Sequence, residues 1–201
     1  MILGLTGGYC SGKSSIASLL RAAGWAIVDV DALGHAALER SASAVAGLLG
    51  PGVIRPDGSP DRRAIGTLVF GNADLLARYE AIIHPAMNAL VAEAVATAAG
   101  AADGRVCVDA ALLYRLPVAN SCEAIIEVRS PLLARILRGK ARDGIGTRAI
   151  LARIARQKPL WIARQTHAKK VTVVMNCGSK ERLHSKMQAL IKRLEPPLGL
   201  N

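Results

Sequence analysis

Apolar and polar positions follow two different periods along the chain. Five short apolar runs are typical of buried strands, and they are ILGLT (2–6), WAIVDV (25–30), VCVDA (106–110), AIIEV (124–128) and VTVVM (171–175). Between these runs, apolar residues recur three and four positions apart, which is the spacing of one face of a helix. Strands that alternate with helices predict a three-layer α/β/α fold with a five-stranded parallel sheet.

Two stretches show helical spacing but contain no strand of this sheet. In the first, a helix is expected after Asn72, a residue type that caps helices, and Pro85 predicts the start of another helix. The second stretch predicts a basic helical hairpin. We therefore expect one domain that has a core of 1–35, 103–130 and 167–201, a helical insertion at 36–102 and a basic lid at 131–166.

Composition narrows the class of protein. Hydrophobic residues make up 51% of the 201 residues, enough for a large core. No apolar run approaches the roughly 18 residues of a membrane span, and no signal peptide is visible. The four cysteines show neither C-x-x-C pairs nor zinc-ligand spacing, so reduced thiols are the simplest account. We expect a cytoplasmic protein that does not bind a membrane.

The net charge of +11 is concentrated in one part of the chain. Residues 128–180 carry 13 Lys and Arg and one acidic residue, Asp143, whereas the charges of the other residues nearly balance. Such a patch is compatible with nucleic acid, with a polyanionic small molecule or with a solvated helix face. The aromatic side chains on which single-stranded nucleic acids stack are scarce, since they are 3% of the residues.

The segment GLTGGYCSGKSS (4–15) places a phosphate-loop pattern directly after the first predicted strand. Gly7, Gly12, Lys13 and Ser14 satisfy G-x-x-x-x-G-K-[ST], in which backbone N–H groups cradle phosphates, the lysine reaches the β- and γ-phosphates and the serine hydroxyl binds Mg²⁺. A chance glycine turn is the alternative, but it leaves the Lys-Ser pair unexplained. The predicted residues of the nucleotide-phosphate site are Gly8, Cys10, Ser11, Gly12, Lys13, Ser14 and Ser15, with Ser14 as the metal ligand.

Three aspartates lie at or just beyond the ends of predicted strands, at the edge where ligands of parallel sheets bind. Asp29 and Asp31 stand two residues apart at the end of the second strand, and Asp109 lies at the end of the third. A carboxylate that faces the γ-phosphate can accept the proton of an attacking hydroxyl, which makes Asp31 a candidate general base. The alternative is that Asp31 only caps the next helix.

Motifs outside the loop extend over nearly the whole chain. They include IVDVD after the second strand, DGSPDRRAIGTLVF and LLARYEAIIHP in the helical insertion, and MNCGS near the C-terminus; Arg138 and Arg142 lie in the predicted lid, and Gln157 follows. Together with LTGGYCSGKS, this pattern resembles the dephospho-coenzyme A kinase family. The chain departs from the family at Ala111 and Arg115, where proline and glutamate are usual, and it lacks the acidic residue that usually precedes the last strand.

The resemblance implies a phosphate-loop kinase that transfers the γ-phosphate of ATP to the ribose 3′-hydroxyl of dephospho-coenzyme A. It implies that Asp31 accepts the hydroxyl proton, while Lys13, Mg²⁺, Arg138 and Arg142 neutralise charge. The implied acceptor-binding residues are Asp31, Arg62, Arg63, His84, Asp109 and Tyr114, and Asn176 and Gly178 are expected near the ATP adenine. The implied partners are these two small molecules and no nucleic acid, in a monomer or small homo-oligomer.

Several alternatives remain open at this stage. The chain could be another small-molecule or nucleotide kinase of the same fold, a basic nucleic-acid-binding ATPase, or an inactive member of the family. Among the residues, His84 could only cap a helix before Pro85, Arg63 could be a surface charge, and Tyr114 could only fill the core.

Overall fold

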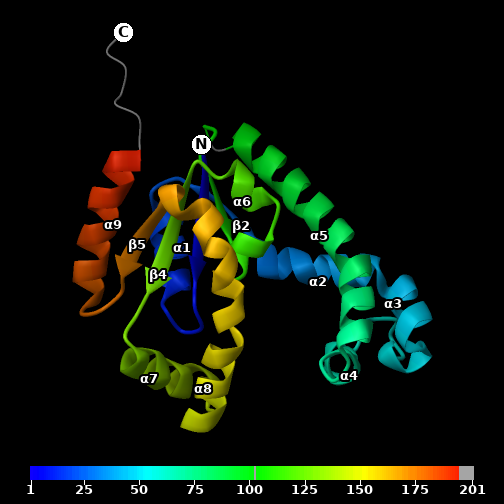
Figure 1. Cartoon of the computed structure of the whole chain (residues 1–201). Coiled ribbons are helices and arrows are strands. Elements are labelled where there is room, and N and C mark those ends of the chain that lie inside the picture. The colour runs from blue at the N-terminus through cyan, green and yellow to red at the C-terminus, as the bar shows by residue number, and fades with distance from the viewer. Residues whose placement is uncertain (102, 195–201) are drawn as a thin grey trace. The chain divides into compact units, whose positions relative to one another are not determined.

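The computed structural model describes residues 1–101 and 103–194 (Figure 1). By the density of contacts, the chain divides into two compact units. The first comprises Met1–Val28 and Thr97–Asn201, and the second is Asp29–Ala96. The second unit overlaps most of the helical insertion predicted at 36–102, but it also includes residues 29–35, which the sequence analysis expects in the core.

A five-stranded sheet forms the centre of the first unit. Its strands follow one another in space in the order β2-β3-β1-β4-β5, and the pairs β1–β3, β1–β4 and β4–β5 are parallel. The strands are β1 (Ile2–Gly7), β2 (Ala26–Asp29), β3 (Val106–Asp109), β4 (Ala124–Arg129) and β5 (Val171–Met175). All five predicted strands are confirmed, each within one residue of its expected ends. Because β1 is central, the loop that follows it lies at the middle of the carboxyl edge.

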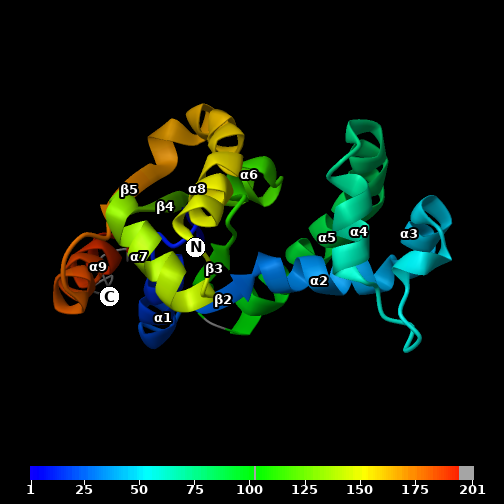
Figure 2. The same ribbon diagram turned by 90° about the horizontal axis from the view of Figure 1, so that it is seen from below.

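Helices α1 (Lys13–Ala22) and α9 (Lys180–Leu194) cover one face of the sheet (Figures 1 and 2). Ile16 and Leu20 of α1 and Met187 of α9 pack with Leu3 and Leu5 of β1 in one apolar cluster. Each fully buried leucine or isoleucine stabilises the fold by roughly 1.5–3 kcal/mol relative to an exposed one. This burial anchors α1, and with it the first turn that carries Lys13 and Ser14.

The short helices η2 (Leu113–Arg115), α6 (Val118–Ser121) and η3 (Lys158–Lys170) also belong to the first unit. Leu113 packs directly onto β1, where a Cβ at Gly4 would lie 2.5 Å from Leu113 Cδ2. The fully buried Glu127 of β4 accepts hydrogen bonds from the Tyr114 hydroxyl at 2.7 Å and from Nε of Arg129 and of Arg164, each at 2.5 Å. A buried carboxylate thus joins β4 to η2 and η3.

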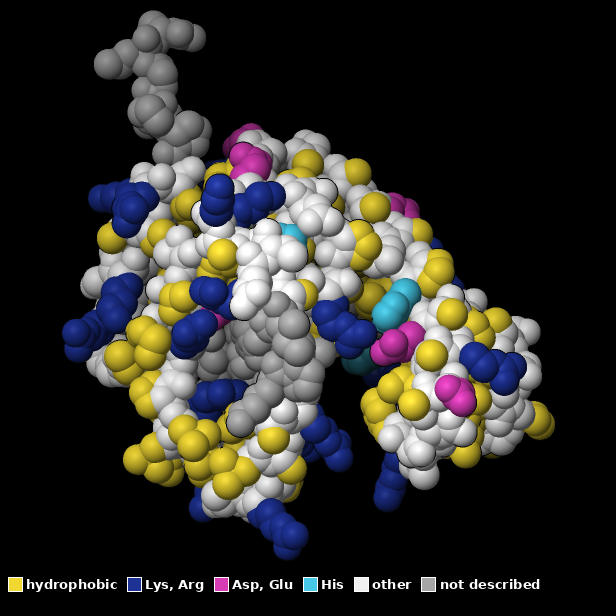
Figure 3. Space-filling view, in the orientation of Figure 1, with side chains coloured by type: hydrophobic (Ala, Val, Ile, Leu, Met, Phe, Trp, Pro, Cys, Tyr) yellow, Lys and Arg dark blue, Asp and Glu magenta, His cyan; other side chains and the backbone are white. Residues whose placement is uncertain are grey.

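The predicted basic hairpin is confirmed as α7 (Leu132–Asp143) and α8 (Thr147–Arg156), which we call the lid. Gly144 follows α7 in the left-handed region with a φ of 65°, where glycine makes the turn without strain. Figure 3 shows Lys and Arg side chains together with apolar ones over the part of the molecule where α7 and α8 lie. Three leucines of α7, Leu132, Leu133 and Leu137, are exposed.

The second unit is helical, as the sequence predicts. It contains α2 (Val30–Arg40), α3 (Ala42–Leu49), η1 (Pro51–Val53), α4 (Arg62–Val69) and most of α5 (Ala73–Ala101). Ala37, Val45, Ile65 and Ile83 form the centre of its own apolar cluster. Asn72 accepts a hydrogen bond from Leu75 N at 3.1 Å, so the predicted cap at the start of α5 is confirmed.

Helix α5 differs from the sequence prediction in two respects. Pro85 lies inside the helix and does not begin a new one. Proline removes the hydrogen bond to the carbonyl of Ala81, but Ala81 is exposed and water can bond to it, while Ile83 and Leu90 bury the same face on either side. By length and composition α5 could also cross a membrane, so the expectation that no apolar run reaches this length is wrong. Core helices of soluble proteins meet the same criterion.

The buried Glu127 generates a prediction about acid stability. Burial alone raises the pKa of this carboxyl, but the hydrogen bonds from Tyr114, Arg164 and Arg129 outweigh it and hold the pKa below the usual value of 4.5. Glu127 therefore stabilises the fold above pH 4.5, and this contribution is lost as the pH falls through the lowered pKa. We expect Glu127→Gln to reduce the free energy of unfolding at pH 7 by about 2–3 kcal/mol.

Urea unfolding between pH 3 and pH 7 measures this effect, and Glu127→Gln should depend less on pH below 4.5 than the wild type. Tyr114→Phe is the control, since it removes one hydrogen bond, costs about 1 kcal/mol and keeps the titrating carboxylate. Equal pH profiles for the wild type and Glu127→Gln would contradict the assignment.

Candidate active site

The turn between β1 and α1 has the backbone of a phosphate-binding loop. Gly12 has a φ of 95° and Cys10 a φ of 55°, both in the left-handed region. Ser11 N donates to Gly8 O at 3.0 Å, and Gly12 O accepts from Ser15 N at 3.1 Å as α1 begins. A glycine is required at position 12, because a Cβ there would lie 2.0 Å from Asn176 Nδ2.

Side chains from the lid and from the turn after β5 hold the outer side of the loop. Arg135 Nε donates to Tyr9 O at 2.7 Å, and Arg138 Nη1 donates to Cys10 O and Ser11 O at 3.3 Å each. The buried Asn176 donates from Nδ2 to Ser11 O at 2.9 Å. These loop carbonyls therefore have donors within the protein, as a loop needs when its N–H groups serve an anion.

Lys13 and Asp109 form an ion pair at the carboxyl edge of the sheet. Lys13 Nζ donates to Oδ1 of Asp109, and the two side chains are only 18% and 11% exposed. The structure thus brings together two residues that the sequence assigns to the site from separate motifs. Asp109 holds the ammonium group next to the loop.

A pocket of about 790 Å³ lies beside the loop, a volume within the range of small-molecule sites. It is lined by parts of the loop, α1, the lid, the turn after β5 and α9. Eight of the predicted site residues line it, and these are Cys10, Gly12, Ser14, Ser15, Arg138, Arg142, Asn176 and Gly178. The lid arginines and the loop therefore share one concave site that can hold a nucleotide.

Two further predicted loop residues, Gly8 and Ser11, line a smaller pocket of about 330 Å³, and Lys13 lines neither of these two pockets. Its polar lining includes Arg129, Arg135 and Arg164, whose charges are only partly balanced by Glu127. Burial lowers the pKa of the half-buried Arg135, although Cys10 opposes this shift. The excess of positive charge suits phosphate groups.

The donor set fits Mg²⁺ only together with a phosphorylated ligand. Ser14 is exposed in the first turn of α1 and lines the larger pocket, and Asp109 is the nearby carboxylate that pairs with Lys13. Within residues 1–101 and 103–194, no group of three or more His, Cys, Asp or Glu could hold a metal ion. Mg²⁺ commonly takes one or two protein ligands and completes its shell with phosphate oxygens and water, which agrees with this pair.

The second unit carries four more of the predicted residues, Asp31, Arg62, Arg63 and His84. Asp29, not Asp31, caps α2, since Asp29 Oδ1 accepts from Ala32 N at 3.1 Å. The alternative that Asp31 is the helix cap is therefore wrong, and its carboxylate is exposed in the first turn. His84 is exposed inside α5, so it does not cap a helix before Pro85 either.

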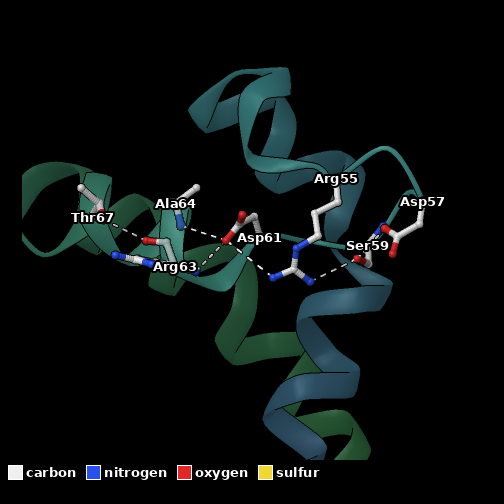
Figure 4. A network of polar contacts seen from close by, with 7 residues as sticks. All are labelled: Arg55, Asp57, Ser59, Asp61, Arg63, Ala64 and Thr67. Atoms are coloured by element: carbon white, nitrogen blue, oxygen red, sulfur yellow. Dashed lines mark hydrogen bonds and ion pairs between the residues drawn. The ribbon is translucent and has the colours of Figure 1, made fainter.

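Arg62 and Arg63 at the start of α4 are exposed, and Figure 4 shows Arg63 beside the Asp61 cap. Asp61 caps α4 by accepting from Arg63 N and Ala64 N, and the hydrogen bond from Ala64 N is the main cause of its lowered pKa. The side chain of Arg63 lines a pocket of about 490 Å³ within this unit. Arg62 lies 3.9 Å from Glu39 in an exposed ion pair.

Tyr114 has a different environment from the other predicted acceptor residues. It is buried in the first unit, where its hydroxyl donates to Glu127 and its ring stacks on His167 with centroids 5.9 Å apart. These contacts agree with the interpretation that Tyr114 fills the core.

Sequence reasoning missed Arg135, which contacts the loop from the lid, and Tyr9, a loop residue that contacts the lid. Arg135 holds the carbonyl of Tyr9, and Tyr9 itself reaches the lid through its hydroxyl, which donates to Asp143. Asp143 carried a signal, because it is the one acidic residue in an otherwise basic segment. No pattern in the sequence distinguishes Arg135 or Tyr9 from an ordinary surface residue.

Comparisons with known proteins agree on one family. The family model described as dephospho-CoA kinase matches residues 1–183. A dephospho-CoA kinase of Anaeromyxobacter dehalogenans is 37% identical over 201 residues, covering 98% of this chain and 94% of the relative. One from Paramagnetospirillum magneticum is 38% identical over 160 residues, covering 79% and 75% of the two chains.

Solved structures support the fold. The crystal structure of TT1252 from Thermus thermophilus matches with a TM-score of 0.81 and 31% identity, covering 98% of both chains. A dephospho-CoA kinase from Campylobacter jejuni matches with a TM-score of 0.65 and 18% identity, covering 96% of this chain and 97% of the other, which shows the fold alone.

The environment of Gly12 predicts the effect of a single methyl group. Gly12→Ala places a Cβ against Asn176 and forces alanine into the left-handed region, which costs about 1–2 kcal/mol before any clash. We expect a lower Tm and at least a tenfold weaker affinity for ATP, measured by calorimetry. Gly47→Ala in α3 is the control, because its Cβ meets nothing within 4 Å and helix propensity improves. Unchanged ATP binding in Gly12→Ala would contradict the loop assignment.

Proposed function

The chain belongs to the dephospho-CoA kinase family, and we propose that Lys13, Asp31, Arg138 and Arg142 carry out its phosphoryl transfer. The reaction moves the γ-phosphate of ATP to the ribose 3′-hydroxyl of dephospho-CoA, the last step of coenzyme A biosynthesis. The observation that supports these roles best is the shared pocket in which lid arginines face the phosphate loop.

The phosphate loop and lid supply the positive charge that phosphoryl transfer needs. Such reactions depend on in-line positioning and on neutralising charge more than on covalent chemistry. Lys13 would exchange its contact with Asp109 for the β- and γ-phosphates, while Arg142 reaches them from the lid. Arg138 already donates to Cys10 O and Ser11 O of the loop and to Ser130 Oγ directly after β4, so its role includes holding the loop.

Mg²⁺ is the proposed metal, held by the Ser14 hydroxyl and phosphate oxygens, with Asp109 nearby. When bound, it would offset the negative charge of the phosphates. The protein side chains then need to place the two substrates and to move one proton. Asn176 and Gly178, which line the same pocket, are proposed to lie beside the ATP base.

Asp31 is the proposed general base. Its carboxylate takes the proton of the 3′-hydroxyl as the oxygen bonds to the γ-phosphorus, and the bond from that phosphorus to the bridging oxygen breaks to release ADP. The exposed carboxylate has no capping task, since Asp29 performs it. A free acceptor site is what a general base requires.

The second unit is proposed to bind dephospho-CoA. Arg62 and Arg63 at the start of α4 and His84 on α5 expose side chains that can bind phosphate groups of the acceptor. Together with the basic lid, they account for the high net charge through two polyanionic substrates rather than nucleic acid. We further propose a cytoplasmic enzyme that works as a monomer or small homo-oligomer.

The two aspartates of IVDVD give a matched test of the general base. Asp31→Asn cannot accept a proton, and loss of a positioned base typically lowers kcat by ~10²–10⁴. ATP binding and the Tm should stay near wild type, because neither the loop nor the cap of α2 uses Asp31. Coupled ADP release with dephospho-CoA measures kcat.

Asp29→Asn is the control, since asparagine caps a helix nearly as well as aspartate and should leave kcat within a few fold. If Asp31→Asn retains more than about a tenth of wild-type kcat, Asp31 is not the base.

A further inference from the structure

Asp143 accepts hydrogen bonds from two arginines and a tyrosine, although the proposed mechanism gives it no role. It ends α7, and its carboxylate accepts from Arg142 Nε at 2.7 Å, from Arg142 Nη2 at 3.3 Å and from Arg153 Nη1 of α8 at 2.7 Å. The hydroxyl of Tyr9 donates to Oδ2 of the same carboxylate. Three side chains from the phosphate loop and both lid helices therefore meet at one acid.

Tyr9 contacts both arginines through the face of its ring as well. The guanidinium carbons lie 5.0 Å (Arg142) and 5.5 Å (Arg153) from the ring centroid, within the range of cation–π contact. The backbone of Tyr9 is fixed in turn, because its carbonyl accepts from Arg135 and its N–H donates to Gln157 Oε1 at 2.6 Å. The ring is thus a rigid support attached to the phosphate loop.

This support determines how Arg142 is presented to the pocket. Asp143 occupies the edge of the guanidinium formed by Nε and Nη2, which leaves Nη1 and the second hydrogen of Nη2 for another acceptor. Arg142 also lines the larger pocket, and its side chain is 60% exposed. An arginine this exposed has many rotamers, so a carboxylate and a ring that fix one of them reduce the entropy lost when a phosphate binds.

We propose that Tyr9 and Asp143 are positioning residues that hold Arg142 ready for the phosphates of ATP. The inference rests on the proposed role of Arg142 in the transfer. Asp143 acts directly on the guanidinium, and Tyr9 acts through Asp143 and through its ring. The hydrogen bonds from Arg142 and Tyr9 hold the pKa of Asp143 well below its usual range, so it stays ionised at neutral pH.

A double-mutant cycle with Arg142 tests the proposal. Asp143→Asn weakens the hydrogen bonds that the guanidinium of Arg142 donates to position 143, and Tyr9→Phe removes one hydroxyl while keeping the ring. We expect kcat to fall about tenfold in Asp143→Asn and about threefold in Tyr9→Phe, with KM for dephospho-CoA within about twofold of wild type. In the Arg142→Ala background, neither change should lower kcat further.

Arg148→Gln controls for net charge, because Arg148 is an exposed residue of α8 outside this network. Combined with Asp143→Asn, it restores the charge of the lid, and kcat should stay low. Tm values identify a variant that fails to fold, and Asp143→Glu, which keeps the carboxylate, should recover part of the activity.

The outcomes separate this proposal from the one on which it rests. Wild-type kcat in Arg142→Ala would overturn the catalytic role of Arg142 and the positioning role with it. If Arg142→Ala lowers kcat and Tyr9→Phe or Asp143→Asn lowers it further in that background, only the positioning role is overturned. Full recovery of kcat when Arg148→Gln is combined with Asp143→Asn would also overturn the positioning role alone.

Discussion

A loop that offers its N–H groups to a phosphate must find hydrogen-bond donors elsewhere for its own carbonyl groups. Here the donors lie far along the chain, since Arg135 and Arg138 come from the lid and Asn176 from the turn after β5. The phosphate loop is therefore stable only when the lid and the end of β5 are in place. Because β1, β4 and β5 are parallel neighbours in the sheet, the loop, the start of the lid and the turn after β5 follow strands that end at the same edge.

The same contacts give the arginines of the lid two different roles. Arg135 and Arg138 use their donors on loop carbonyls, whereas Arg142 is tied to Asp143 and opens onto the pocket. Positive charge in the lid thus has two uses, to support the loop and to neutralise phosphates. The surplus of Lys and Arg in residues 128–180 follows from these two needs in a kinase with two polyanionic substrates.

The strands and the loop could be predicted because local patterns determine them, through apolar runs of strand length and the glycines before Lys13. Pro85 misled the prediction, since tertiary packing on both sides of it keeps α5 continuous. For the pair Asp29 and Asp31, only the backbone geometry decided which one caps α2. Tyr9 and Arg135 could not be identified, because their partners are more than 100 residues away in sequence.

The central claim is that this loop, lid and helical unit transfer a phosphate to one hydroxyl of one acceptor. The most direct measurement incubates the protein with ATP, Mg²⁺ and dephospho-CoA and locates the new phosphate by ³¹P NMR, with ADP quantified in parallel. The account predicts one phosphate on the ribose 3′-hydroxyl for each ADP formed and no product from Lys13→Ala. ADP release without a phosphorylated acceptor, or a phosphate on another hydroxyl, would contradict it.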